Sequence, residues 1–398
     1  MIKDEGIIYW VWLSQVLGAG NTDVEYILSK FDSPKALYEF SKTQDCDNSK
    51  FFSNYIKSKM KNTSVDDAKL IVEECKNLGY EIITFKDEKY PFRLKNIYAS
   101  PLILYMNGDI GNIDDELAIS IIGARKCSDY AKQVTKIFSQ QLSLNGITIV
   151  SGMAVGVDGI ALEEALNCNG KVIAVIGCGL DVDYPLKNLS LKKRIEASPN
   201  GCIISEYPPK TRPLAGHFPV RNRIMSGISV GVLVVEAGIR SGSLITAKMA
   251  IDQGKDVYGV PNNIFFEKNY GVINLLKDGA TIVTEPQDII QQYKWKYSFN
   301  HINSITAKSN GELKGIVSGV DNNTSSIIDI NIKEDYNLDG VLKEIYYLLY
   351  NDGEPRNVDY ISEMLNLPVN EVLVNITELE LSGLIKNYPG MKYGINLS

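Results

Sequence analysis

The chain has 398 residues, with 41 Lys and Arg against 48 Asp and Glu, which gives a formal net charge of −7. This acidic balance excludes a protein whose whole surface attracts nucleic acid, so any such binding must come from a local patch. The six cysteines are scattered without a CxxC pair and there are only two histidines, which is typical of neither a disulfide framework nor a zinc site.

The length is sufficient for two or three domains, one of them with a full hydrophobic core. The first nine residues include acids and lack a long apolar stretch, so they do not resemble a signal peptide. No apolar run approaches the length of a membrane span. We therefore expect a cytoplasmic protein with no contact with a membrane.

Residues 1–85 are predicted to be helical. Two helical runs, 7–17 and 22–30, flank a Gly-x-Gly at Gly18 and Gly20, whose backbone amides could meet a phosphate, although a plain turn explains the same pattern. Ser33-Pro34 then has the N-cap and N1 chemistry of another helix. Further along, the lysines between residues 50 and 61 are interleaved with aromatic residues, a pattern that a solvated helix face also produces.

From about residue 80 the sequence pattern changes to short apolar runs that alternate with predicted amphipathic helices such as 130–144, 158–166 and 244–253. This alternation predicts a mostly parallel sheet with helices on both faces. Ligands of such sheets bind beyond the carboxyl ends of the strands. The predicted strands are 82–85, 102–106, 118–122, 147–150, 172–176, 202–205, 230–235, 257–260 and 281–283.

Four of these strands deliver glycine to the same edge of the predicted sheet. We expect the loops after the first three to approach phosphate through Gly123, Ser151, Gly152, Gly156, Gly177 and Gly179. Neither a GxxxxGK[ST] loop nor a complete dinucleotide fingerprint is present, so no nucleotide cofactor is predicted. Asp158 could be an N-cap, a metal ligand or a catalytic acid, and the start of a helix there favours the cap.

The fourth of these strands, 230–235, lies in the segment 217–250, which combines an aromatic ring, fixed cations and a helix start. Phe218 precedes Arg221 and Arg223, with no matching acid among them, which suits bases stacked on a charged backbone. Beyond the strand, Ser241-Gly242-Ser243 opens a helix whose free amides suit a phosphate. A packed loop would explain the aromatic and basic residues alone, and an ordinary helix cap would explain Ser241-Gly242-Ser243 alone. The occurrence of both features within one βα unit favours nucleic-acid binding.

The last hundred residues divide into a polar stretch and a small compact unit. Residues 293–337 show little periodicity and are predicted to be a linker. Residues 338–398 have the pattern of a winged helix-turn-helix: helices over 339–350, 358–365 and 368–381, then strands over 384–387 and 392–395. Four cations and nine acids give this unit a net charge of −5, which favours a protein contact or packing over DNA binding.

The chain resembles the DprA/Smf family of DNA-processing proteins over nearly its whole length. The motifs that carry the resemblance include 122–125 (IGAR), 150–158 (VSGMAVGVD), 177–181 (GCGLD), 205–208 (SEYP), 218–223 (FPVRNR) and 240–247 (RSGSLITA). The resemblance implies an extended Rossmann-like α/β core over 86–292, an N-terminal SAM-like or helix-hairpin-helix domain over 1–85 and a winged-helix domain over 338–398. It also implies single-stranded DNA binding as a homodimer, loading of the RecA recombinase during natural transformation, and displacement of single-strand-binding protein.

The resemblance assigns DNA contacts first to Arg125 and to the group Phe218, Arg221 and Arg223. The further candidates are Lys126, His217, Asn222, Arg240, Ser241, Gly242, Ser243 and Lys248.

Two other classes of function remain open at this point. One is a hydrolase that acts on a nucleotide or phosphorylated small molecule in the Gly-rich cleft, with Asp158, Glu206 and Glu236 as its acids. No Ser or Cys nucleophile with a partnered histidine and no metal-ligand spacing accompanies them, so no catalytic residue or metal is assigned. The other is a scaffold that acts through its acidic ends.

Overall fold

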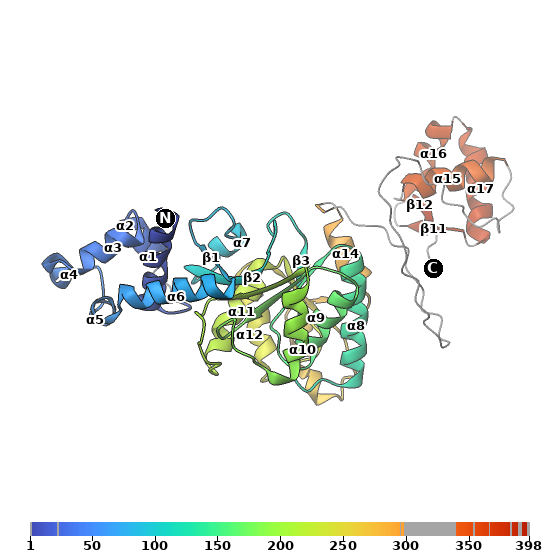
Figure 1. Ribbon diagram of the computed structural model, residues 1–398. Helices are drawn as coiled ribbons and strands as arrows, with labels where there is room; N and C mark the ends of the chain where they lie inside the picture. Colours follow the sequence, from blue (N-terminus) through green and yellow to red (C-terminus); the bar gives the residue numbers. More distant parts are fainter. Residues whose placement is uncertain are drawn as a thin grey trace. The chain divides into compact units, whose positions relative to one another are not determined.

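A computed structural model describes residues 2–21, 24–294, 296–297, 340–352, 355–365, 367–382, 384–388 and 392–395. The chain divides into two compact units, Met1–Ala307 and Lys308–Ser398 (Figure 1). The predicted linker begins inside the first unit, because a helix continues to Tyr293. Its residues 298–337 lie outside the described residues.

Six helices form the N-terminal part of the first unit: α1 (Ile2–Leu17), α2 (Val24–Lys30), α3 (Pro34–Ser41), α4 (Gln44–Asn48), α5 (Asn54–Asn62) and α6 (Val65–Leu78). The cap predicted for α3 is confirmed, because the Ser33 side chain accepts a hydrogen bond from the amide of Ala36. Trp12 is buried in α1, and its indole Nε1 donates to the carbonyl of Thr63 at 3.1 Å. This bond fastens α1 to the turn between α5 and α6.

A nine-stranded sheet follows in the order β1-β2-β6-β5-β4-β3-β7-β8-β9. Its pairs from β6 to β9 are parallel, whereas β2 pairs antiparallel with both β1 and β6. The predicted mostly parallel sheet is therefore confirmed. The strands are β1 (Glu81–Thr84), β2 (Ile103–Gly108), β3 (Ala118–Ile122), β4 (Thr148–Ser151), β5 (Val172–Ile176), β6 (Gly201–Ser205), β7 (Gly231–Val234), β8 (Asp256–Gly259) and β9 (Thr281–Ile282).

Helices cover both faces of this sheet, as the alternation predicts. Successive side chains of a strand point to opposite faces, so Ile119 and Ile121 of β3 belong to one hydrophobic cluster and Ala118 and Ile122 to another. The first cluster includes α8 (Asp129–Leu144), α9 (Val157–Asn167) and α10 (Leu189–Ala197). The second includes α7 (Phe92–Lys95), α11 (His217–Ile228), α12 (Gly242–Asp252) and α13 (Tyr270–Lys277). The last helix described in this unit, α14 (Gln287–Tyr293), contributes to the first cluster.

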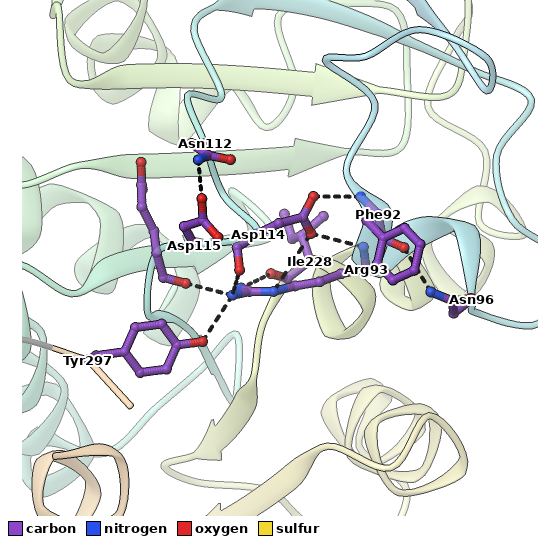
Figure 2. Close-up of polar contacts among 9 residues, drawn as sticks. Phe92, Arg93, Asn96, Asn112, Asp114, Asp115, Ile228 and Tyr297 are labelled. Atoms are coloured by element: carbon purple, nitrogen blue, oxygen red, sulfur yellow. Dashed lines mark hydrogen bonds and ion pairs between the residues drawn. The ribbon is translucent and has the colours of Figure 1, made fainter. Parts of the chain in front are cut away.

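Arg93 of α7 holds the C-terminal end of α11 at the edge of the sheet where β3 begins. Its guanidinium donates to the carbonyls of Ile228, Asp114 and Glu116 at 3.1, 2.8 and 2.7 Å. It also donates to the hydroxyl of Tyr297 at 3.1 Å (Figure 2). The other end of α11 therefore lies at the opposite edge, where the parallel strands end.

The second unit has its own core and a small sheet. It contains α15 (Val341–Asp352), β10 (Arg356–Asn357), α16 (Val358–Leu365), α17 (Val369–Leu381), β11 (Ile385–Tyr388) and β12 (Lys392–Ile395). The strands pair in the order β10-β12-β11 around buried Ile345, Ile361 and Ile376. Three helices and a hairpin confirm the predicted winged-helix pattern, and only the two-residue β10 escaped prediction because it is too short to show alternation.

Candidate nucleic-acid interface

Phe218, Arg221 and Arg223 lie in the first two turns of α11 rather than in a loop before β7. Pro219 is tolerated there because a proline in the first turn of a helix removes no internal hydrogen bond. α11 begins at His217, close to the ends of β5 and β6. The motif therefore projects from a rigid element at the edge of the sheet where such folds bind ligands.

Three side chains from three loops or helices meet at the start of α11. The ring of Phe218 is half-buried, with its centroid 5.6 Å from that of Tyr184. The guanidinium carbon of exposed Arg125, from the loop after β3, lies 5.6 Å from the same ring centroid. Next to them His217 stacks on Tyr207 at 4.1 Å, and its Nδ1 lies 3.1 Å from the carbonyl oxygen of Gly177. This arrangement presents an aromatic face beside a cation.

Arg221 points inward from α11 and is only 4% exposed. Its Nη1 donates to the carbonyls of Gly152, at 2.7 Å, and Val175. It also faces buried Asp158, whose pKa burial raises to about 6 against the opposing effect of the guanidinium. Burial likewise lowers the pKa of Arg221, and the nearby charge of Asp158 opposes this effect. A matching acid that the sequence pattern did not reveal therefore faces this arginine.

Arg223 is 5% exposed and is also paired with an acid. Its Nη2 lies 2.7 Å from Oε1 of Glu206, and its other nitrogens donate to the carbonyls of Ala99 and Val220. The same Glu206 oxygen accepts a hydrogen bond from the amide of Gly20 at 3.3 Å. The expectation that these arginines lack a matching acid is therefore wrong. The Gly20 amide, which was considered for phosphate contact, therefore donates to a side chain of the protein instead.

The glycines at the strand ends are accounted for by close packing. A Cβ on Gly152 would lie 2.6 Å from the Arg221 guanidinium and from Oδ2 of Asp158. Gly156 has φ +90°, and a Cβ there would lie 2.4 Å from the carbonyl oxygen of Ala124. The remaining members of the predicted set are also in contact with the protein: Gly123 with Val157, Gly177 with Phe218, Gly179 with Asp181, and Ser151, through its Oγ, with the carbonyl of Ile121.

Asp158 is not the N-cap that its position in the sequence suggested. The N-cap of α9 is Gly156, and Asp158 is the second residue of the helix. Its carboxylate instead accepts backbone amides of the loop before the helix and faces Arg221. A capping side chain and a buried counter-ion occupy similar sequence positions, which is why the pattern could not separate them.

The start of α12 forms another wall of the site. Ser241 caps the helix, because its Oγ accepts a hydrogen bond from the amide of Ser243 at 3.4 Å. The same Oγ lies 2.6 Å from the Oγ of Ser243. Gly242 is exposed, and nothing lies within 4 Å of a Cβ built there. Between α11 and α12 is a pocket of about 500 Å³, which is large enough to admit a nucleobase. Its lining includes Arg125, Asp158, Tyr184, Phe218, Arg221 and Ser241.

The structure therefore separates the predicted contact residues by accessibility. Those exposed to solvent are Arg125, Lys126, Arg240, Gly242 and Lys248. His217, Phe218 and Ser241 are half-buried, whereas Arg221, Asn222, Arg223 and Ser243 are buried. Asn222 accepts from Nε of Arg221 at 3.2 Å and so supports that side chain.

Sequence analysis missed two aromatic side chains and two acids at this site. Tyr184 contacts Phe218 and Tyr207 contacts His217, and each comes from a loop whose approach to α11 no local pattern encodes. The Tyr184-Pro185 and SEYP motifs were the available signal. Asp158 was interpreted as an N-cap, a metal ligand or a catalytic acid, and Glu206 as a catalytic acid, but each faces an arginine.

The acids considered for hydrolysis are all held by protein groups. Glu236 accepts hydrogen bonds from the amide and hydroxyl of Ser128, at the start of α8. Among the described residues, no group of three or more His, Cys, Asp or Glu side chains is placed to hold a metal ion. No helix in the described ranges is long and apolar enough to cross a bilayer.

Comparison with known proteins gives consistent matches over this core. The family model described as DNA recombination-mediator protein A matches residues 81–294, and the DprA winged helix domain matches residues 338–391. Protein Smf from Synechocystis sp. is 32% identical over 339 residues, which cover 81% of this chain and 82% of that protein. DNA processing protein DprA from Streptococcus pneumoniae is 40% identical over 232 residues, 58% of this chain and 79% of that protein. An X-ray structure of DprA from Streptococcus pneumoniae superposes with a TM-score of 0.59 at 31% identity, covering 73% of this chain and 95% of that one.

Proposed function

Because the chain belongs to the DprA/Smf family of DNA recombination-mediator proteins, we propose that it binds single-stranded DNA in the cleft between α11 and α12. In this role it protects incoming strands and helps to load RecA recombinase during natural transformation and recombination. The observation that carries the proposal is the half-buried Phe218 ring beside exposed Arg125 at the mouth of a pocket of about 500 Å³. An accessible ring next to a cation suits stacked bases on a phosphate backbone.

The residues of the cleft take different parts in this proposal. Arg125, Lys126, Arg240 and Lys248 are exposed and meet phosphates, while the exposed backbone of Gly242 at the start of α12 adds an uncharged contact to a phosphate. Buried Arg221 and its acid position the loop after β4, and Arg223 positions the start of α11. The loops after β3, β4 and β5 offer backbone amides to a phosphate, while the space beside their glycines is filled by protein groups.

The partners of this chain follow from its family. We propose a cytoplasmic homodimer that contacts RecA and displaces single-strand-binding protein, as the family resemblance implies. Two cleft surfaces in one dimer would raise the affinity for a long strand through effective concentration.

We propose a binding protein rather than an enzyme. Three observations favour this choice: Asp158 faces Arg221, Glu206 is paired with Arg223, and Glu236 accepts from Ser128. A general acid or base needs a carboxyl that can reach a substrate proton, and each of these three is engaged in holding a loop or helix.

Fluorescence anisotropy of the purified chain with labelled oligo-dT and with a matching duplex, across a salt series, tests the proposal. We expect tight binding to the single strand with a steep log–log salt slope, and weak binding to the duplex. Absence of binding to either at low salt would refute the DNA proposal. Nucleotide hydrolysis in the same cleft would then be measured.

A further inference from the structure

Residues 49–63 carry a second basic and aromatic surface, remote from the cleft. The segment contains Lys50, Lys57, Lys59 and Lys61 but no Asp or Glu, in a chain whose formal net charge is −7. Its helical part, α5, buries only Ile56 and Met60, so the other positions of the helix face outward. In Figure 1, α5 lies among the N-terminal helices on the side away from the sheet.

Two rings in this segment make little contribution to the hydrophobic core. Phe51 is 57% exposed and Tyr55 is 66% exposed. The adjacent Phe52 is buried, and its ring centroid lies 6.0 Å from that of Phe31 in a stacked arrangement. Phe52 thus anchors the segment and leaves Phe51 and Tyr55 with free faces.

The lysines of the segment divide into two groups. Lys57 and Lys61 are held by Asp47: the Nζ of Lys57 donates to its carbonyl at 2.9 Å, and the Nζ of Lys61 lies 2.5 Å from Oδ1. Lys50 and Lys59 form no ion pair within the part of the chain that the structure describes. The Nζ of Lys59 lies 5.8 Å from the centroid of the Tyr55 ring. Lys59 therefore places a positive charge that no acid of the described residues pairs with beside an exposed ring.

We propose that Lys50, Phe51, Tyr55 and Lys59, here called the α5 surface, form a second contact for single-stranded nucleic acid. Exposed rings interleaved with unpaired cations bind a single strand without regard to its sequence, by stacking and by phosphate contact. The inference rests on the proposed function, because a strand held in the cleft reaches the α5 surface at a raised effective concentration. Only a strand long enough to span both sites gains from it.

The test uses the full-length chain and two lengths of labelled oligo-dT. The short one does not exceed a single site of about 10 nucleotides, and the long one is several times that length. The double variant Phe51→Ala/Tyr55→Ala is expected to bind the short strand as the wild type does and the long strand about 5-fold or more weakly. Tyr26→Ala is the matched control, since Tyr26 is 45% exposed with the Nζ of Lys30 also 5.8 Å from its ring centroid, but lies outside the segment.

A second double variant, Lys50→Gln/Lys59→Gln, tests the cations separately and changes only exposed side chains. We expect the log–log salt slope for the long strand to fall by about 1.4, or about 0.7 for each lost phosphate contact, with no change for the short strand. Long-strand affinities equal to the wild type in both double variants would overturn the inference while leaving the cleft proposal intact. Failure of the wild type to bind either strand would overturn both.

Discussion

Arg125 differs from Arg221 and Arg223 because it is exposed and its guanidinium lies over a ring rather than beside a carboxylate. We expect Arg125→Ala to weaken single-strand binding by about 1 to 3 kcal/mol, the usual cost of a lost charge-assisted contact. Arg194→Ala is the control, because Arg194 is exposed on α10 and paired with Glu163 at 3.1 Å. Titration by anisotropy measures both, and equal losses in the two variants would mean that the effect is only one of net charge.

Phe218 is the ring on which the proposed stacking depends. Phe218→Leu keeps an apolar side chain against Tyr184 but removes the flat face, so the affinity for oligo-dT should fall by about 1 kcal/mol or more. The salt slope should stay unchanged because no cation is lost. An affinity equal to that of the wild type would show that the ring only packs.

The pair of Arg223 and Glu206 joins two elements, because Glu206 also accepts from the turn between α1 and α2. Arg223→Ala should lower the free energy of unfolding by about 3 to 5 kcal/mol, since it leaves a buried carboxylate without its partner. Denaturant unfolding of both single variants and of Arg223→Ala/Glu206→Ala measures their coupling. If the loss of unfolding free energy in the double variant equals the sum of the losses in the two single variants, the pair does not link the elements.

α11 shows that a motif recognised in the sequence can lie on an element that the sequence did not predict. The sequence identified Phe218, Arg221 and Arg223 as a group, but their spacing on a helix places Phe218 and Arg221 on one side and Arg223 on another. Phe218 and buried Arg221 line the pocket, whereas Arg223 points away from it into the protein and pairs with Glu206. A cationic side chain in a motif can contact a ligand only if the fold points it toward solvent.

The C-terminal unit differs in chemistry from a DNA-reading winged helix. α17 carries Glu371, Glu378 and Glu380, all exposed, together with exposed Val374. Deletion of residues 338–398 should therefore leave the affinity for oligo-dT within about 0.5 kcal/mol of the wild type, since an acidic helix repels phosphate. Anisotropy at low salt is the most sensitive measurement of this effect on affinity, because electrostatic repulsion is least screened there. A large loss of affinity on deletion would contradict the prediction.

At the scale of the whole chain, the order of helices and strands followed from periodicity. Runs of buried residues such as Ile119 and Ile121 predicted β3, and the capping chemistry of Ser33 predicted α3. These are local properties, set by the side-chain spacing of strands and helices and by the unpaired amides at helix starts. The sequence by itself thus determined the mostly parallel sheet and the types of most of its helices and strands, and it proposed a cleft beyond the strand ends.

Only the tertiary structure decided which residues of that cleft are free to act. Asp158 is 63 residues before Arg221, and Glu206 is 17 residues before Arg223, yet the fold brings each acid against its arginine. Charge pairing, burial and the meeting of Tyr184 with Phe218 depend on distances between loops that are far apart in the chain. Local patterns do not encode those distances, because packing of the whole sheet and its helices sets them.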